Sequence, residues 1–178
     1  MKVVGFCGWS GAGKTTLVER VIPELRAAGQ RVSVIKHAHH RFDIDHPGKD
    51  SWRHRQAGAF EVIVASRKRF ALMREHEAEH DYNAHQLIAA LTPAADWVLL
   101  EGFRHADVPK VEVWRAGIGD APLYPADPYV VAVATDEPAA LPSATGLPVF
   151  PLDEPAAVAR WLLQHASRHE YDRSRHAC

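Results

Sequence analysis

The chain of 178 residues has only two cysteines, Cys7 and Cys178, and it has no long hydrophobic run. Two cysteines cannot provide the disulfide framework of a small secreted domain, and they favour a reducing cytoplasm. The opening apolar run, MKVVGFCG, is too short for the core of a signal peptide. No run approaches the roughly 20 apolar residues of a membrane span. We therefore expect a soluble, cytoplasmic protein that does not bind membranes.

An excess of basic residues is also missing. Lys and Arg number 21 against 22 Asp and Glu, so the formal net charge is −1. Proteins that bind nucleic acids usually carry a clear basic excess, and we therefore expect no nucleic-acid partner. Histidine, by contrast, is abundant, with 12 residues.

Strand-like and helix-like segments alternate along the chain. Short apolar or β-branched runs predict strands, and apolar positions at helical spacing predict helices. The alternation predicts a three-layer α/β fold, with a mostly parallel sheet and helices on both of its faces. The expected strands cover residues 2–8, 31–37, 96–102, 110–115, 129–135 and 147–152, and the expected helices cover 14–29, 49–58, 82–91 and 154–166.

Residues 58–82 fit this alternation least well. Two strand-like runs, 60–66 and 69–75, flank a short turn and predict a β-hairpin. We interpret 58–75 as a β-ribbon, either a simple insertion or an oligomerisation element, within a single domain that covers 1–168. Residues 169–178 lack apolar periodicity and are expected to form a flexible tail.

The segment GWSGAGKT, residues 8–15, matches the pattern G-x-x-x-x-G-K-[ST] between an expected strand and an expected helix. Glycines let successive backbone N–H groups turn toward a phosphate, and the helix presents its N-terminal amides to the same anion. Lys14 would reach the β- and γ-phosphates, and the hydroxyl of Thr15 would bind Mg²⁺. The motif therefore predicts a nucleotide-binding domain of the P-loop NTPase class.

A P-loop also needs a carboxylate near the magnesium ion. The segment WVLLEG places Glu101 at the end of an apolar strand. The C-terminal ends of parallel strands face the ligand crevice, so Glu101 is our candidate for this role. The alternative is a helix-capping or solvated glutamate.

The segment after the second expected strand concentrates charged and histidine residues. One interpretation is a nucleotide-switching loop, in which Asp45, or second Asp43, contacts the magnesium shell or orients water. Others are an anion site made by the basic residues, a transition-metal site and a solvated loop. The residues concerned are Lys36, His37, His39, His40, Asp43, Asp45, Lys49, Asp50, Arg53 and Arg55.

Three segments together resemble the molybdopterin-guanine dinucleotide biosynthesis adapter (MobB) family: GWSGAGKTTL, VIKHAHHRFDIDHPGKDSWRHRQAGA and LLEGFRH. The second segment is the most specific, and the resemblance covers roughly residues 1–150. It implies a GTP-binding homodimer with weak GTPase activity that assists formation of molybdopterin guanine dinucleotide. The implied partners are molybdopterin, the molybdopterin guanylyltransferase and, as a second candidate, the molybdopterin molybdenumtransferase.

The resemblance also implies the site residues, and it names Mg²⁺ and GTP as the ligands. Residues 36–53, with His37 among them, would line the site. The sequence has no N-K-x-D element, with which ordinary GTPases bind guanine. Asp136 follows a late strand in a comparable position, and it is our candidate for accepting from guanine, with a loop-capping aspartate as the alternative. The phosphate set is Ser10, Gly11, Ala12, Gly13, Lys14, Thr15 and Thr16; the metal set is Thr15, Glu101 and Asp45; the catalytic candidates are Lys14 and Asp45.

Two further function classes fit the same motif. A P-loop small-molecule kinase shares the phosphate loop and the chain length, and a metal-delivering GTPase chaperone would use His37, His39 and His40. The choice of GTP over ATP depends on the resemblance alone. Hydrolysis is expected to be slow unless an arginine assists it, and the candidates are Arg53, Arg55, Arg67 and Arg104.

Overall fold

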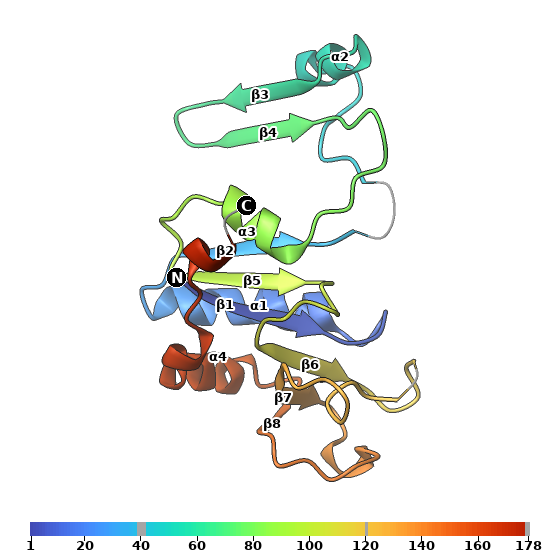
Figure 1. Ribbon diagram of the computed structural model, residues 1–178, viewed down its shortest axis with the longest axis vertical. Helices are drawn as coiled ribbons and strands as arrows, with labels where there is room; N and C mark the ends of the chain where they lie inside the picture. Colours follow the sequence, from blue (N-terminus) through green and yellow to red (C-terminus); the bar gives the residue numbers. More distant parts are fainter. Residues whose placement is uncertain (39–41, 120, 177–178) are drawn as a thin grey trace. The chain divides into compact units, whose positions relative to one another are not determined.

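The computed structural model describes residues 1–38, 42–119 and 121–176 (Figure 1). The chain forms two compact units, which are described separately. The first combines Met1–His37 with Asn83–Cys178, and the second is Ala38–Tyr82. None of the helices in the described ranges has the length and apolar character needed to cross a bilayer.

The first unit is built on a six-stranded parallel sheet with the order β2-β5-β1-β6-β7-β8. Its central strands are buried along almost their whole length. Near-continuous apolar runs are typical of parallel strands covered on both faces. This confirms the predicted α/β class. The strands are β1 (Lys2–Cys7), β2 (Val32–Lys36), β5 (Trp97–Glu101), β6 (Lys110–Trp114), β7 (Val130–Thr135) and β8 (Val149–Pro151).

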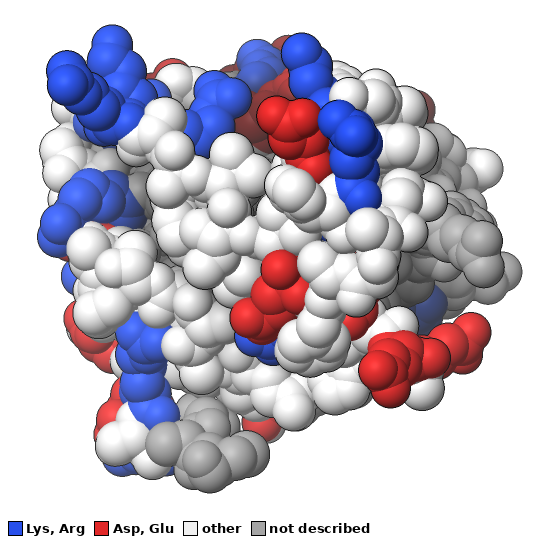
Figure 2. Space-filling view, turned by 90° about the horizontal axis from the view of Figure 1, so that it is seen from above, with Lys and Arg blue, Asp and Glu red and all other residues white. Residues whose placement is uncertain are grey.

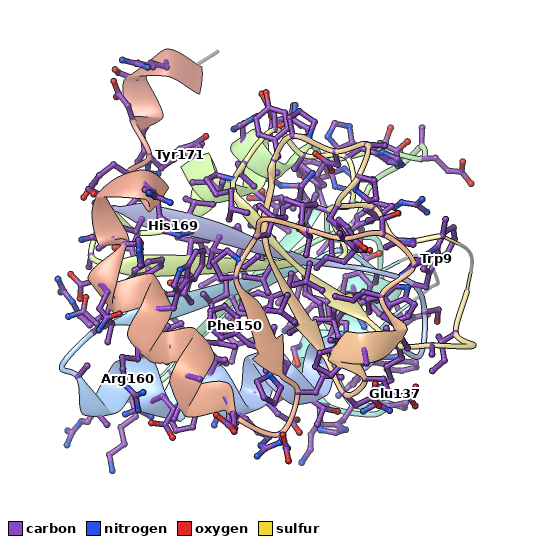
Figure 3. The ribbon with its side chains drawn as sticks, turned by 90° about the horizontal axis from the view of Figure 1, so that it is seen from below. Trp9, Glu137, Phe150, Arg160, His169 and Tyr171 are labelled. Atoms are coloured by element: carbon purple, nitrogen blue, oxygen red, sulfur yellow. The ribbon has the colours of Figure 1, made fainter. Side chains whose placement is uncertain are left out.

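One face of this sheet is covered by two helices, α1 (Lys14–Ala27) and α4 (Pro155–Gln164), which lie side by side (Figure 3). Apolar residues of α1 recur at helical spacing, so one face of the helix enters the core. The largest buried cluster of the protein forms here and fixes α1 against β1. Its helical members are Leu17, Val18, Val21, Leu25, Val158, Ala159, Trp161 and Leu162.

The opposite face has a mixed cover. The short helix α3 (Ala84–Ala90) packs Ile88 against β5, and Asn83 caps it through a reciprocal hydrogen-bond pair with Gln86. Beside it, the segment between β6 and β7 contributes Tyr124 to a third cluster. The structure therefore has three layers, but part of the third layer is a loop.

The second unit contains the helix α2 (Asp50–Gln56) and an antiparallel hairpin of β3 (Glu61–Ala65) and β4 (Phe70–Arg74). Figure 1 shows the two strands joined by a short turn. The hydroxyl of Ser66 accepts from the backbone N–H of Arg69 at 3.0 Å and helps to close this turn. The hairpin expected within 58–75 is confirmed.

The segment expected to be a flexible tail packs against the first unit in its described part. His169 is buried, and its Nδ1 lies 3.3 Å from the carbonyl oxygen of Val3. The backbone N–H of Tyr171 donates to the carbonyl of Met1 at 2.9 Å. Figure 3 shows His169 and Tyr171 beyond the end of α4. These contacts join the end of the chain to the start of β1.

Candidate functional site

The glycine loop between β1 and α1 adopts a backbone that other residues would strain. Gly8 has a φ of 129°, and a Cβ there would lie 2.1 Å from the carbonyl oxygen of Val113. Gly13 has a φ of 100° and immediately precedes α1. No side chain caps the helix and its first turn contains no acidic residue. The N-terminal amides and the positive end of the helix dipole are therefore available to an anion.

Lys14 folds back across this loop. Its Nζ donates to the carbonyl oxygens of Gly8 at 3.0 Å and Trp9 at 2.8 Å. Partial burial lowers the pKa of this ammonium, because desolvation disfavours its charge. The positive charge thus lies within the loop, where it can transfer its hydrogen bonds to phosphate oxygens.

Thr15 and Glu101 meet at the edge of the sheet. The hydroxyl of Thr15 donates to Oε1 of Glu101, which is 7% exposed. The register of the sheet explains this position, because Glu101 ends β5 between Phe6 of β1 and Lys36 of β2. The sequence assigned both side chains to the magnesium site, and the structure brings them together.

Lys36 completes this group. Its Nζ lies 3.2 Å from Oε1 of Glu101 and 3.4 Å from Oγ1 of Thr15. A carboxylate and a hydroxyl suit Mg²⁺, which takes few protein ligands and keeps several waters. The Lys36 ammonium neutralises the Glu101 carboxylate in this structure, and a bound divalent cation would take over that role. Lys36 belongs to the charged segment that follows the second expected strand, but its contact with Glu101 could not be predicted from the sequence.

Asp136 directly follows β7 and lies beside the start of α1, and its role in binding a base stays a prediction. It lines a cavity of about 260 Å³ together with Gly13 and Thr16. Its Oδ2 is 3.1 Å from Nε of Arg115, a residue that sequence reasoning missed. Arg115 directly follows β6, so the same sheet-edge argument that found Glu101 could have found it.

His37 follows β2 and lies next to the Thr15–Glu101 pair. Its backbone N–H donates to the carbonyl of Glu101 at 2.8 Å, and its ring is 5.2 Å from that of Phe103. Gly102 permits this approach, since a Cβ there would lie 2.9 Å from the carbonyl oxygen of His37. The backbone thus places His37 at the same sheet edge as the glycine loop.

Asp45 belongs to the second unit, where Arg55 organises a group of carboxylates. The Arg55 guanidinium lies 2.9 Å from Asp43, 3.3 Å from Asp45 and 2.7 Å from Glu75. Burial opposes the charge of Asp45, but hydrogen bonds from the His46 backbone and the Ser51 hydroxyl lower its pKa overall. The observed role of Asp45 is therefore to order its own unit, and its catalytic and metal roles stay predictions.

Arg55 is also unsuited to assist phosphate chemistry from this position, because its charge is already shared by three carboxylates. Within the described ranges, no group of three His, Cys, Asp or Glu side chains could hold a metal ion. His39 and His40 of the alternative transition-metal site lie outside the described residues.

Comparison with known proteins decides the family. Residues 3–136 match the family model for MobB, described as molybdopterin guanine dinucleotide synthesis protein B. This chain belongs to the MobB family. A relative from Escherichia coli K12, named molybdopterin-guanine dinucleotide biosynthesis adapter protein, is 44% identical over 138 residues, or 76% of this chain and 79% of the relative. A relative of the same name from Haemophilus influenzae Rd is 47% identical over 138 residues, covering 76% and 75%.

Solved MobB structures share the fold. The crystal structure of Bacillus subtilis MobB has a TM-score of 0.69 and 25% identity, covering 97% of this chain and 100% of that one. A MobB homologue from Bacillus stearothermophilus has a TM-score of 0.67 and 23% identity, covering 94% and 99%. The MobB family resemblance inferred from the sequence is therefore confirmed. Lys14, Thr15, Glu101 and Asp136 all fall within the matched range.

Proposed function

We propose that this MobB-family protein binds GTP with Mg²⁺ and acts as an adapter in the formation of molybdopterin guanine dinucleotide. The observation that carries the proposal is the convergence of the Thr15 hydroxyl and the Glu101 carboxylate beside an uncapped helix N-terminus. A hydroxyl, a carboxylate and a glycine loop are the parts that hold a triphosphate and its metal ion in P-loop proteins.

In this proposal, different residues of the site bind the phosphates, the metal ion and the base. The amides of Gly11, Gly13 and the first turn of α1 hold phosphate oxygens, and Lys14 exchanges its carbonyl partners for the β- and γ-phosphates. Thr15 and Glu101 would hold the metal ion in place of their present contacts with Lys36. The bound ion would neutralise charge on the phosphate oxygens. Asp136 accepts from the guanine N1 and N2 groups after it releases Arg115.

Turnover is slow in this proposal. Unassisted P-loop GTPases hydrolyse at about 10⁻⁴ to 10⁻² per second, and a positioned arginine adds about 10³- to 10⁵-fold. Arg55 is engaged by carboxylates, and the guanidinium of Arg104 lies over the ring of Trp9. Neither contact directs a free arginine at a phosphate. The role of the protein is thus that of an adapter whose state depends on its nucleotide.

The hairpin supports the proposed homodimer. Ile63 pairs with Leu72 across the strands, and Phe70 lies on the same face as Leu72, so the three side chains form one apolar surface. Their exposed fractions are 60%, 45% and 67% for Ile63, Leu72 and Phe70. A two-stranded hairpin is marginal by itself and gains stability when an apolar face is covered. Figure 2 shows that residues other than Lys, Arg, Asp and Glu cover much of the face seen from above, with an acidic group near the middle and basic groups mainly at the rim.

The proposed partners are those of the pathway. They are molybdopterin, the molybdopterin guanylyltransferase and, as a second candidate, the molybdopterin molybdenumtransferase, all met in the cytoplasm. The names of the relatives and the family description support a place in this pathway.

The proposal is tested by calorimetric titration with GTP in the presence and absence of Mg²⁺. Glu101→Gln should weaken binding of GTP·Mg²⁺ by about tenfold or more, and binding of metal-free GTP much less, because the amide cannot neutralise the cation. Glu137→Gln, which alters an exposed acid outside the site, is the matched control. Equal losses with and without Mg²⁺ would remove Glu101 from the metal site. The same titrations with ATP measure the preference for guanine.

A further inference from the structure

A groove of about 640 Å³ lies beside the glycine loop, and the proposed GTP site does not use it. Its volume is within the range of about 300 to 1,000 Å³ that is usual for small-molecule sites. It lies on the side of the sheet opposite α1 and is bounded by the segment between β6 and β7. The side chains that matter for its chemistry are Trp9, Arg104, His105, Lys110, Asp127 and Tyr129.

The floor of the groove is a buried and fully engaged lysine. Lys110 is 1% exposed, and its Nζ lies 2.6 Å from Oδ2 of Asp127. The same ammonium donates to the carbonyls of Arg104 at 3.0 Å and Ala106 at 2.8 Å. Gly5 gives it room, because a Cβ there would lie 2.7 Å from Cγ of Lys110. Lys110 thus ties the two walls together, and its charge is balanced by Asp127.

Arg104 forms one wall and is not balanced in this way. Its guanidinium carbon lies 4.1 Å from the centre of the Trp9 ring. No carboxylate in the described ranges is within ion-pair distance of Arg104, although the buried carboxylate of Glu112 interacts with its charge at longer range, and the buried Nε of Arg104 has no hydrogen-bond acceptor in these ranges. A buried N–H donor without an acceptor destabilises the folded protein. An anion that binds here could accept hydrogen bonds from the guanidinium group.

Tyr129 provides a second aromatic surface on the other side. Its side chain is 43% exposed, and its ring centre is 5.5 Å from Nζ of Lys110. His105 is exposed at the same groove. The groove therefore combines two aromatic rings with a guanidinium that has no carboxylate of the described residues within ion-pair distance. This combination suits a flat ring with an attached anionic group, since rings stack on aromatic and guanidinium planes and Arg binds phosphate through two N–H groups.

Trp9 connects the groove with the phosphate loop. Its carbonyl accepts from Lys14 at 2.8 Å, and its indole Nε1 donates to the carbonyl of Ala121 at 3.2 Å. A movement of Lys14 toward a nucleotide would therefore free the backbone carbonyl of Trp9, whose indole keeps its hydrogen bond to Ala121. A ligand in the groove would lie next to the nucleotide site through this shared residue.

We propose that the groove binds a planar heteroaromatic ring that carries a phosphate, and that in this protein the ring is a pterin. Arg104 donates to the phosphate, and the ring lies against Tyr129. The choice of a pterin rests on the proposed function, whereas the preference for a ring with an anion rests on the groove itself. A protein segment with an acidic side chain is the competing occupant.

The test uses neopterin monophosphate as the probe, because its fluorescence reports stacking on an aromatic side chain. The full-length protein should quench the probe saturably, and neopterin without phosphate and inorganic phosphate should each bind at least about tenfold more weakly. Arg104→Ala should also weaken binding by about tenfold or more, and Arg104→Lys should restore only part of it. Arg160→Ala is the matched control, because Arg160 is exposed on α4 and lies away from Trp9 (Figure 3).

GTP binding is measured on each variant as a check of folding. Retained GTP binding by Arg104→Ala separates a failure of the groove from a failure of the nucleotide site. Three results would overturn the proposal: absence of saturable quenching, equal losses in the Arg104 and Arg160 variants, and displacement of the probe by GTP·Mg²⁺, which would put its phosphate in the glycine loop. Loss of guanylyltransferase binding in Arg104→Ala with unchanged probe binding would instead assign the groove to a protein segment.

Discussion

The two units of this protein use opposite means to hold their functional surfaces. In the first unit, Thr15 and Glu101 are fixed by a parallel sheet whose strands are almost entirely buried. In the second unit, α2 contributes no buried residue and the hairpin leaves most of its apolar side chains exposed. The first unit therefore holds its candidate site in a buried framework, and the second unit presents exposed apolar side chains.

This difference also separates two kinds of functional residue. In the proposed function, Lys14 and Glu101 would act through geometry that their own unit completes. Ile63 and Phe70 would act only when another surface covers them, because exposed apolar patches can mark association sites. Substitutions in the two units should consequently affect different measurements.

The largest effect is expected from Lys14→Ala. Removal of the ammonium leaves the phosphate charge unpaired, so affinity for GTP·Mg²⁺ should fall by about 100-fold or more. Isothermal titration calorimetry measures the affinity, and Lys68→Ala, at the turn of the hairpin, is the matched control. Light scattering should show an unchanged oligomeric state. If Lys14→Ala lost both GTP binding and the dimer, the two functions would not belong to separate units, and the prediction would be wrong.

Ile63→Glu should have the converse effect. A carboxylate that is buried in an apolar interface must be desolvated without a partner. The association constant of the dimer should therefore fall by roughly tenfold or more. Sedimentation should therefore show a shift from dimer to monomer, with GTP affinity within about twofold of the parent. Glu61→Gln, on the same strand, is the control for general damage to the hairpin. A monomeric parent protein, or a dimeric Ile63→Glu variant, would rule out this interface.

The sequence predicted the first unit well because its signals are local. The glycine pattern, the strand before it and the periodic helix after it occupy consecutive residues, and Glu101 follows a buried apolar run. Parallel strands bring their C-terminal ends to one edge, so a position in sequence becomes a position in the site. The contact of Lys36 with Glu101 follows from the same register, but it requires knowledge that β2 pairs with β5.

The sequence also predicted the helix and the hairpin of the second unit, but not the ion pairs that order this unit, nor the groove of the first unit. Arg55 binds carboxylates that are far from it in sequence, and the spacing of charges in a loop does not reveal which of them pair. Lys110 reads as part of a strand, and only the packed structure shows that Gly5 makes room for it. His169 could not be predicted for the same reason. It belongs to a polar segment without apolar periodicity, yet its side chain is buried and contacts the backbone carbonyl of Val3.

The smallest expected effect concerns the pH dependence of the second unit's stability. The backbone N–H of Asp45 and the Arg55 guanidinium lower the pKa of Asp43, and the pKa of Asp45 is also lowered. Depressed carboxyl pKa values stabilise the folded state above the unfolded pKa of about 4, and this contribution is lost as pH falls through the folded values. Arg55→Met should therefore speed amide exchange in residues 50–75 by about three- to tenfold at neutral pH.

That difference between Arg55→Met and the parent protein should shrink below about pH 4, where protonated carboxyls no longer pair with the guanidinium. Hydrogen exchange with mass spectrometry measures it, after correction for the intrinsic pH dependence of exchange. Peptides from β5 are the internal control, because their protection depends on apolar burial and should be the same in both proteins. A difference that persists at low pH would mean that Arg55 stabilises its unit through the packing of its aliphatic chain, and the ion pairs would then be incidental to the contrast between the two units.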